Sequence, residues 1–177
     1  GIEQNKELPE YDYCYCDVCR ETFKQQKGID PLSIMHPDQS LSWRKFRYNN
    51  ITRLVNRLSV VAHEYKKPVT AAVFPTPEVA RRIVRQDWTN WNLDAVCPMI
   101  YHGFYKEDIS WIGDAVAEGV KGIGGKFPLY AGLYLADFNN EDEIKKAVGL
   151  AMQNGAAGVS IFGKPDTTVL EILKSVK

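Results

Sequence analysis

The feature that most constrains the fold is a succession of short apolar segments, each followed by a helix pattern. The predicted strands are residues 69–74, 93–101, 128–134 and 157–162, and the helices after them are expected over 76–91, 109–120, 141–154 and 167–176. Short, continuously apolar strands are typical of a parallel sheet. Regular alternation of strand and helix indicates parallel β-α units joined by right-handed crossovers.

The predicted fold class is therefore α/β. A complete (β/α)₈ barrel needs about 250 residues, and this chain has 177. The sequence predicts either half of such a barrel or a small open sheet. Half a barrel would leave two sheet edges unpaired, so we expect the chain to form a homo-oligomer through those edges.

A different pattern precedes the first strand. A short helix is expected over 14–27, ended by Gly28, and a loop over 33–41. From Ser42, the expected N-cap, a long helix runs to about Lys67. Its predicted apolar face comprises Phe46, Ile51, Leu54, Val55, Leu58, Val61 and Ala62. We treat 1–177 as one domain in which 1–41 is a cysteine-containing segment before the long helix.

The charge balance excludes several classes of partner. Lys plus Arg and Asp plus Glu are equal at 22 each, so the sequence does not favour a nucleic acid or an anionic membrane surface as partner. No apolar run approaches the roughly 20 residues of a membrane span. The chain begins Gly1-Ile2-Glu3 without methionine, and we expect it to be part of a longer protein.

Three stretches carry a resemblance to a known family. They are Trp43-Arg44-x-Phe46-Arg47, Gln86-Asp87-Trp88-x-x-Trp91 and Pro98-Met99-Ile100-Tyr101. In this order and spacing they resemble the glycosyl hydrolase-like family 10 barrels, from about Tyr11 to the end of the chain. The resemblance implies the C-terminal half of a TIM (β/α)₈ barrel, strands 5–8, and a carbohydrate partner whose glycosidic bonds the whole protein hydrolyses. Glycosidases that use two glutamates place one at the end of strand seven, where this sequence has Asp137.

The carboxyl ends of the predicted strands supply the candidate site, because that edge carries the active site in such barrels. Asp137 and His102 are the candidate catalytic residues, and Tyr101, Tyr134 and Phe74 the candidate substrate-binding residues. Thr76 and Phe162 lie at the same edge. The alternatives are that Asp137 caps the helix after it and that Tyr101 and His102 only close the barrel mouth. Trp43, Trp88 and Trp91 are expected to pack rather than to bind sugar.

Three cysteines form the sharpest local motif, Cys14-x-Cys16-x-x-Cys19. Thiolates at this spacing can converge on one Zn²⁺, which prefers four tetrahedral ligands. The motif resembles the zinc cluster of family 42 β-galactosidases, where a fourth cysteine comes from earlier in the chain. We predict a structural Zn²⁺ site at these three residues and no required cofactor. The alternative is free or oxidised cysteines at the start of a helix.

The sequence thus predicts a glycoside hydrolase fragment that is inactive by itself. Two alternatives stay open: a non-catalytic carbohydrate-binding or scaffold barrel with a degenerate site, and a small metal-binding domain organised by the cysteines.

Overall fold

The computed structural model describes residues 14–175, so the first 13 residues of the cysteine-containing segment 1–41 and residue 176 of the last predicted helix lie outside the described residues. The helices are α1 (Asp17–Lys27), α2 (Leu41–Glu64), α3 (Pro77–Val84), α4 (His102–Tyr105), α5 (Trp111–Ile123), α6 (Glu141–Gln153) and α7 (Thr167–Ser175). The strands are β1 (Thr70–Val73), β2 (Ala95–Pro98), β3 (Tyr130–Tyr134) and β4 (Gly158–Phe162). Single turns of 3₁₀ helix occur at Pro31–Ser33, Trp88–Asn90 and Leu135–Asp137.

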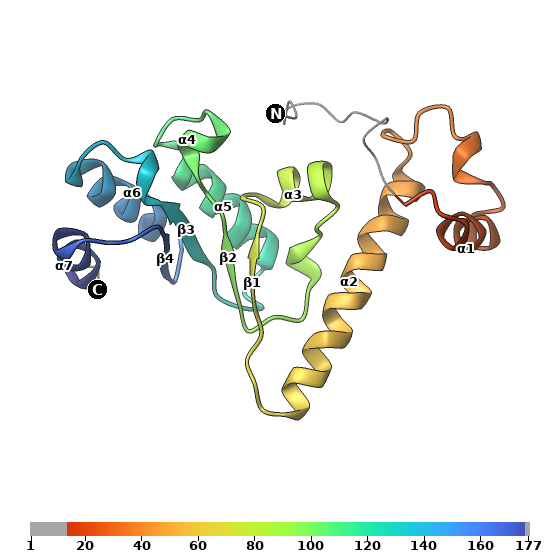
Figure 1. Cartoon of the computed structure of the whole chain (residues 1–177), viewed down its shortest axis with the longest axis horizontal. Coiled ribbons are helices and arrows are strands. Elements are labelled where there is room, and N and C mark those ends of the chain that lie inside the picture. Colours follow the sequence, from red (N-terminus) through yellow and green to blue (C-terminus); the bar gives the residue numbers. More distant parts are fainter. Residues whose placement is uncertain (1–13, 176–177) are drawn as a thin grey trace.

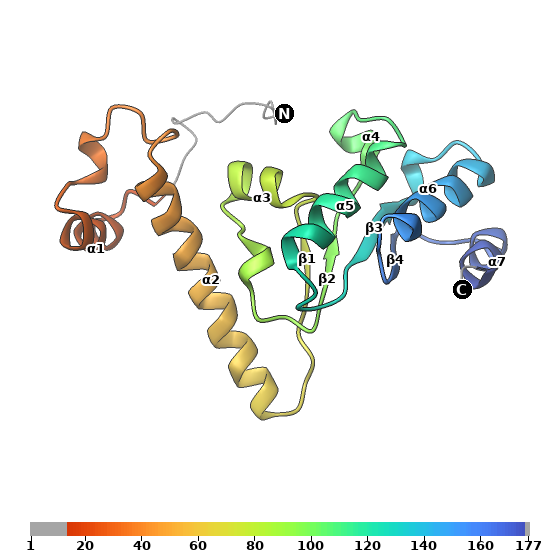
Figure 2. The ribbon, with the colours of Figure 1, turned by 180° about the vertical axis from the view of Figure 1, so that it is seen from behind.

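All strand pairing among the described residues is parallel. β1 pairs with β2 and β3 pairs with β4. Two parallel bridges, Val96 with Leu129 and Met99 with Gly132, join the two halves, so the strands lie in chain order. Figures 1 and 2 show this order, with α1 on the far side of α2 from the strands. The predicted α/β class with parallel strands is confirmed.

The main core lies on one face of these strands. Alternate strand residues, among them Val73, Val96, Ala131 and Leu133, are fully buried in it. The helix residues in the same cluster come from α3, α5, α6 and α7: Ala80, Ile112, Ala115, Val116, Ile123, Ile144, Ala147, Val148, Ala151, Val169 and Ile172. The intervening strand residues point to the other face because side chains alternate along a strand. That face, called here the open face, carries Thr70, Ala72, Ala95, Cys97, Met99, Tyr130, Gly132, Tyr134, Gly158, Ser160 and Phe162.

A second, smaller core holds α1 against the start of α2. It consists of Phe23, Trp43 and Phe46, whose rings lie 5.0–5.4 Å apart between centroids. Arg47 is also buried, with its guanidinium 5.8 Å from the centre of the Trp43 ring. Arg47 thus belongs to the small core, because its planar guanidinium packs against the indole.

The predicted apolar face of α2 is only half right. Ile51 and Val55 pack against the main core. Leu54, Leu58 and Val61 are 60%, 60% and 52% exposed. These three lie on an adjacent stripe of the helix, and the main core covers only the stripe that contains Ile51 and Val55.

Several predicted helix ends are corrected. Ser40, and not Ser42, caps α2, because its hydroxyl accepts the Trp43 N–H. The helix expected to reach Trp91 ends at Val84, because Arg85 adopts a left-handed conformation with φ 58°. Trp88 then lies in a separate 3₁₀ turn. Trp43, Trp88 and Trp91 are at most 7% exposed, which confirms packing as their role.

Gly132 in β3 is required by a close approach of β2. A Cβ built on it would lie 2.5 Å from the carbonyl oxygen of Pro98, which is backbone and cannot rotate away. Gly132→Ala is expected to destabilise the fold by about 1–3 kcal/mol. Gly149→Ala in α6, where a Cβ would meet nothing within 4 Å, should instead stabilise it by about 0.5–1 kcal/mol. Denaturant unfolding of both variants checks this, and equal effects would contradict the close packing of β2 on β3.

Asp94 links the start of β1 and the end of α2 to the segment before β2 through its side-chain contacts. Its carboxylate accepts the Val69 N–H at 2.6 Å and lies 2.8 Å from His63 Nε2. The Val69 N–H first, and His63 second, lower the pKa of Asp94 below its ordinary value of 3.8.

Because the folded-state pKa of Asp94 is the lower one, its contribution to stability is present above pH 3.8 and disappears as the pH falls through the folded-state pKa. We expect Asp94→Asn to be less stable than the unchanged chain at neutral pH, with the difference shrinking below pH 3.8. Urea unfolding across a pH series measures this difference. Exposed Glu171→Gln is the control, and a difference that does not depend on pH would contradict the assignment.

Candidate functional site

Three aromatic rings gather where β2, β3 and β4 end. Tyr101 follows β2, Tyr134 ends β3 and Phe162 ends β4. The ring centroids lie 5.6 Å apart for Tyr101 and Tyr134, 5.7 Å for Tyr101 and Phe162, and 5.2 Å for Tyr134 and Phe162. We call these three residues the aromatic patch. Tyr134 and Phe162 point to the open face because they pair with each other across β3 and β4.

The aromatic patch is accessible to a ligand. Phe162 is 58% exposed, and Tyr101 and Tyr134 are partly exposed. Exposed large apolar rings that lie together are uncommon unless they bind something. Flat rings offer an apolar face, and the two phenols add groups that can donate and accept hydrogen bonds. The sequence predicted Tyr101 and Tyr134 here, and the structure brings them together.

His102 and Asp137 lie next to the patch. His102 begins α4 and Asp137 ends the 3₁₀ turn after β3. The His102 Nδ1 atom is 3.9 Å from Asp137 Oδ2, and the two side chains are 10% and 9% exposed. This separation is too long for a hydrogen bond, and the buried Nδ1 has no hydrogen-bond partner among residues 14–175. The Phe138 ring packs against the imidazole at 5.1 Å.

Asp137 is held by the backbone of α4. The Gly103 N–H donates to Asp137 Oδ2 at 3.1 Å. A Cβ on Gly103 would lie 2.7 Å from Asp137 Oδ1, so any larger residue would force the Asp137 side chain to shift. The alternative that Asp137 caps the helix after it is wrong, because Asn140 caps α6 by accepting the Glu143 N–H. The short helix α4 was absent from the sequence prediction, and so was the contact that Gly103 makes.

The phenols around this site are shifted away from ionisation. Burial first, and the Asp137 charge second, raise the pKa of Tyr101. Burial raises the pKa of Tyr105 to about 12. The Tyr101 phenol of the patch therefore stays protonated at neutral pH and can donate a hydrogen bond to a ligand hydroxyl.

Phe74 and Thr76 do not join the patch. Phe74 packs against the main core, and its N–H donates to Gln86 Oε1 at 3.1 Å. Thr76 is 3% exposed and caps α3, with its hydroxyl accepting the Val79 N–H at 3.2 Å. Of the strand-end residues predicted from the sequence, the structure therefore gathers Tyr101, His102, Tyr134 and Asp137 with Phe162 and leaves Phe74 and Thr76 in structural positions.

The cysteine motif surrounds the first turn of α1. Cys14 and Cys19 have their sulfur atoms 3.0 Å apart, and Cys16 is the N-cap residue. The Cys19 N–H lowers the pKa of the exposed Cys16 thiol, and Cys14 raises that of Cys19 to about 12. Within residues 14–175, no group of three His, Cys, Asp or Glu residues is arranged to hold a metal ion. The Zn²⁺ site stays a prediction.

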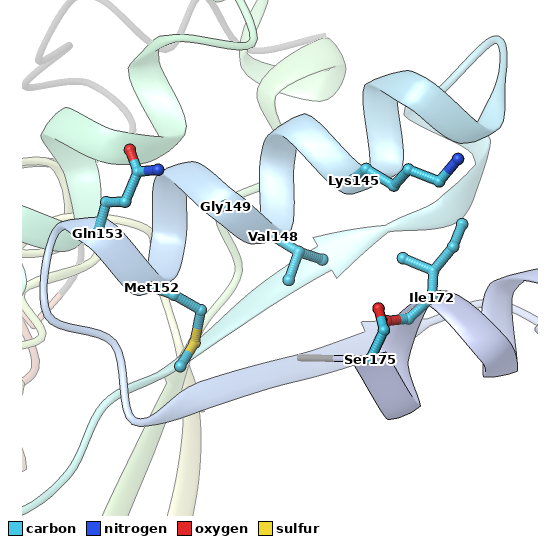
Figure 3. Close-up of a pocket in the computed structure, with 7 residues that line it drawn as sticks. All are labelled: Lys145, Val148, Gly149, Met152, Gln153, Ile172 and Ser175. Carbon is cyan, nitrogen blue, oxygen red and sulfur yellow. The ribbon is translucent and has the colours of Figure 1, made fainter. Parts of the chain in front are cut away.

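A separate hollow lies between α6 and α7, away from the strand ends. Figure 3 shows Val148 and Met152 of α6 on one side, with Ile172 and Ser175 of α7 on the other. Its volume is about 250 Å³, which is below the usual 300–1,000 Å³ of small-molecule sites. The aromatic patch with its His102–Asp137 pair is therefore a better candidate site than this hollow.

No protein-family model, curated protein or solved structure matches the chain. In the part of the chain that the structure describes, no helix is both long enough and apolar enough to span a membrane.

The carboxylate of Asp137 is expected to stabilise the link between α4 and the end of β3. Asp137→Ala removes the acceptor of the Gly103 N–H, which should lower the free energy of unfolding by about 1–3 kcal/mol. Asp142→Ala, whose side chain is 91% exposed, should change it by less than about 0.5 kcal/mol. Thermal unfolding of the two variants compares them, and an unchanged Asp137→Ala midpoint would rule out this link.

Proposed function

We propose that this chain supplies the carbohydrate-binding edge of a glycosidase-like (β/α)₈ barrel, of which it forms four β-α units. The observation that carries the proposal is the aromatic patch of Tyr101, Tyr134 and Phe162 beside the buried His102–Asp137 pair. The patch lies at the carboxyl ends of parallel strands, which is the edge where barrels of this type place their ligands.

The half-barrel architecture is supported by the one-sided core. Helices α3, α5, α6 and α7 all pack on the same face of the strands. In an open doubly wound sheet, helices cover both faces, whereas in a barrel they lie outside and the inner face is filled by strand side chains. The open face here carries small residues, Ala72, Gly132, Gly158 and Ser160 among them, together with aromatic ones.

Binding to a sugar follows from the chemistry of the patch. A pyranose ring has apolar C–H faces and a belt of hydroxyl groups. The rings of Tyr134 and Phe162 can stack on such a face, while the phenol of Tyr101 and the nearby imidazole of His102 can exchange hydrogen bonds with hydroxyls. The chain's balanced charge suits a neutral ligand better than a strongly charged one.

Hydrolysis needs more than the patch. Glycosidases use two carboxyl groups on either side of the scissile bond, about 5–9.5 Å apart. Asp137 is the proposed carboxylate, and His102 is the proposed proton donor or acceptor, since the two ring nitrogens of an imidazole can donate and accept hydrogen bonds. The partner carboxyl group would come from outside the described residues. We therefore propose that the chain binds sugar by itself and does not turn it over.

A non-catalytic carbohydrate-binding barrel is the second candidate. It is favoured by the burial of Asp137, whose side chain is 9% exposed and accepts the Gly103 N–H. The carboxylate of Asp137 could therefore have the structural role of holding α4 in place, without any catalytic role.

Self-association also stays a prediction: β1 and β4 are the outermost strands among the described residues, and each has one unpaired edge.

Titration of the chain with neutral oligosaccharides of glucose, xylose, mannose and N-acetylglucosamine tests the binding proposal. We expect at least one series to bind, and Tyr134→Ala and Phe162→Ala each to weaken that affinity at least about tenfold, or 1.4 kcal/mol. Tyr130→Ala is the matched control, because Tyr130 lies at the opposite end of the same strand and is 36% exposed. Calorimetry measures the affinity.

An equal loss of affinity in Tyr130→Ala, or no binding of any series, would contradict the proposal. Aryl glycosides and polysaccharides test the second part. We expect no hydrolysis by this chain, and turnover that Asp137→Ala abolishes would show that it holds a complete catalytic site.

A further inference from the structure

The cysteine motif supports an inference that does not depend on the proposed function. The sulfur atoms of Cys14 and Cys19 lie 3.0 Å apart. Both residues are half-buried and pack against the small core of Phe23, Trp43 and Phe46. Cys16, between them in sequence, is exposed.

The sulfur spacing fits a disulfide better than a metal site. Zinc–sulfur bonds of 2.3 Å in a tetrahedron place two thiolates roughly 3.8 Å apart, which is wider than the 3.0 Å seen here. A disulfide brings its sulfur atoms to about 2.05 Å, so the pair has to close by roughly 1 Å. The described residues also gather no third ligand around a common centre.

The three thiols differ in access. Cys14 and Cys19 are partly covered by the small core, whereas Cys16 precedes the first turn of α1 and is open to solvent. The thiol of Cys16 also neighbours that of Cys19. A dissolved disulfide therefore meets Cys16 first, and Cys19 is in contact with both other cysteines.

We propose that Cys14 and Cys19 are a reversible dithiol–disulfide site, with Cys16 as the exchange thiol through which a small-molecule disulfide such as oxidised glutathione enters. The Cys16 thiolate attacks one sulfur of the glutathione disulfide, whose S–S bond breaks to release one glutathione thiolate. Cys19 then attacks the sulfur of Cys16 and releases the second glutathione thiolate.

In the last step Cys14 attacks the sulfur of Cys19, and the Cys16 thiolate leaves. The two released glutathione thiolates take up the two protons that Cys14 and Cys19 lost. The balance is two protein thiols oxidised to one disulfide and one glutathione disulfide reduced to two glutathione thiols. The resulting disulfide joins Cys14, which precedes α1, to Cys19 in the first turn of α1, beside the small core.

The test uses the whole reduced chain, freed of metal by a chelator and then incubated with oxidised glutathione. We expect two of the four cysteines to lose their thiols, the intact mass to fall by two hydrogen atoms without a glutathione adduct, and fragmentation to place the bond between Cys14 and Cys19. A reducing agent should restore all thiols. Cys97→Ser, which removes the cysteine of β2, is the matched control and should react in the same way.

Two further variants test the route. Cys16→Ser should give the same disulfide at least about tenfold more slowly, because the remaining thiols are less accessible. Cys19→Ser should stop at a glutathione adduct on Cys16. Circular dichroism of the reduced variants shows whether each is folded.

Three outcomes would overturn the proposal. The first is a wild-type chain that keeps all its thiols. The second is a final bond that maps to Cys16 and Cys19. The third is one zinc ion bound per chain with Cys14, Cys16 and Cys19 all protected from alkylation and from exchange.

Discussion

Parallel pairing of the strands in chain order is the interaction on which the rest of the structure depends. Because β1 to β4 run the same way, their carboxyl ends meet at one edge, and residues far apart in sequence become neighbours there. Tyr101 and Phe162 are separated by two β-α units, yet their rings stack at 5.7 Å. Pairing across Gly132 is especially close, since the strand that carries it lies against the carbonyl of Pro98. The positions of the site residues are thus set by the parallel pairing of the backbone.

Much of this arrangement could be predicted from the sequence. The strand segments are apolar runs bounded by polar or glycine-rich stretches, so their positions and the residues at their ends followed directly. Helix ends were harder, because they depend on single backbone conformations. Arg85 adopts a left-handed conformation that is more usual for glycine, and nothing in the sequence pattern indicates that the helix should end before Trp88.

The contacts of the site residues could not be predicted at all. Whether Asp137 capped the next helix or reached another element was decided by α4, which has only four residues and no apolar periodicity. Leu54, Leu58 and Val61 show a second limit. A sequence pattern states which side chains are apolar, and only the packing of other elements decides which of them are covered.

The length of α2 has a mechanical consequence. Its first turns hold Trp43 and Phe46 in the small core, and its middle holds Ile51 and Val55 against the main core. One uninterrupted rod of 24 residues therefore couples two separately packed regions. A break between Arg47 and Ile51 would remove this helical connection and let the two regions move and melt independently.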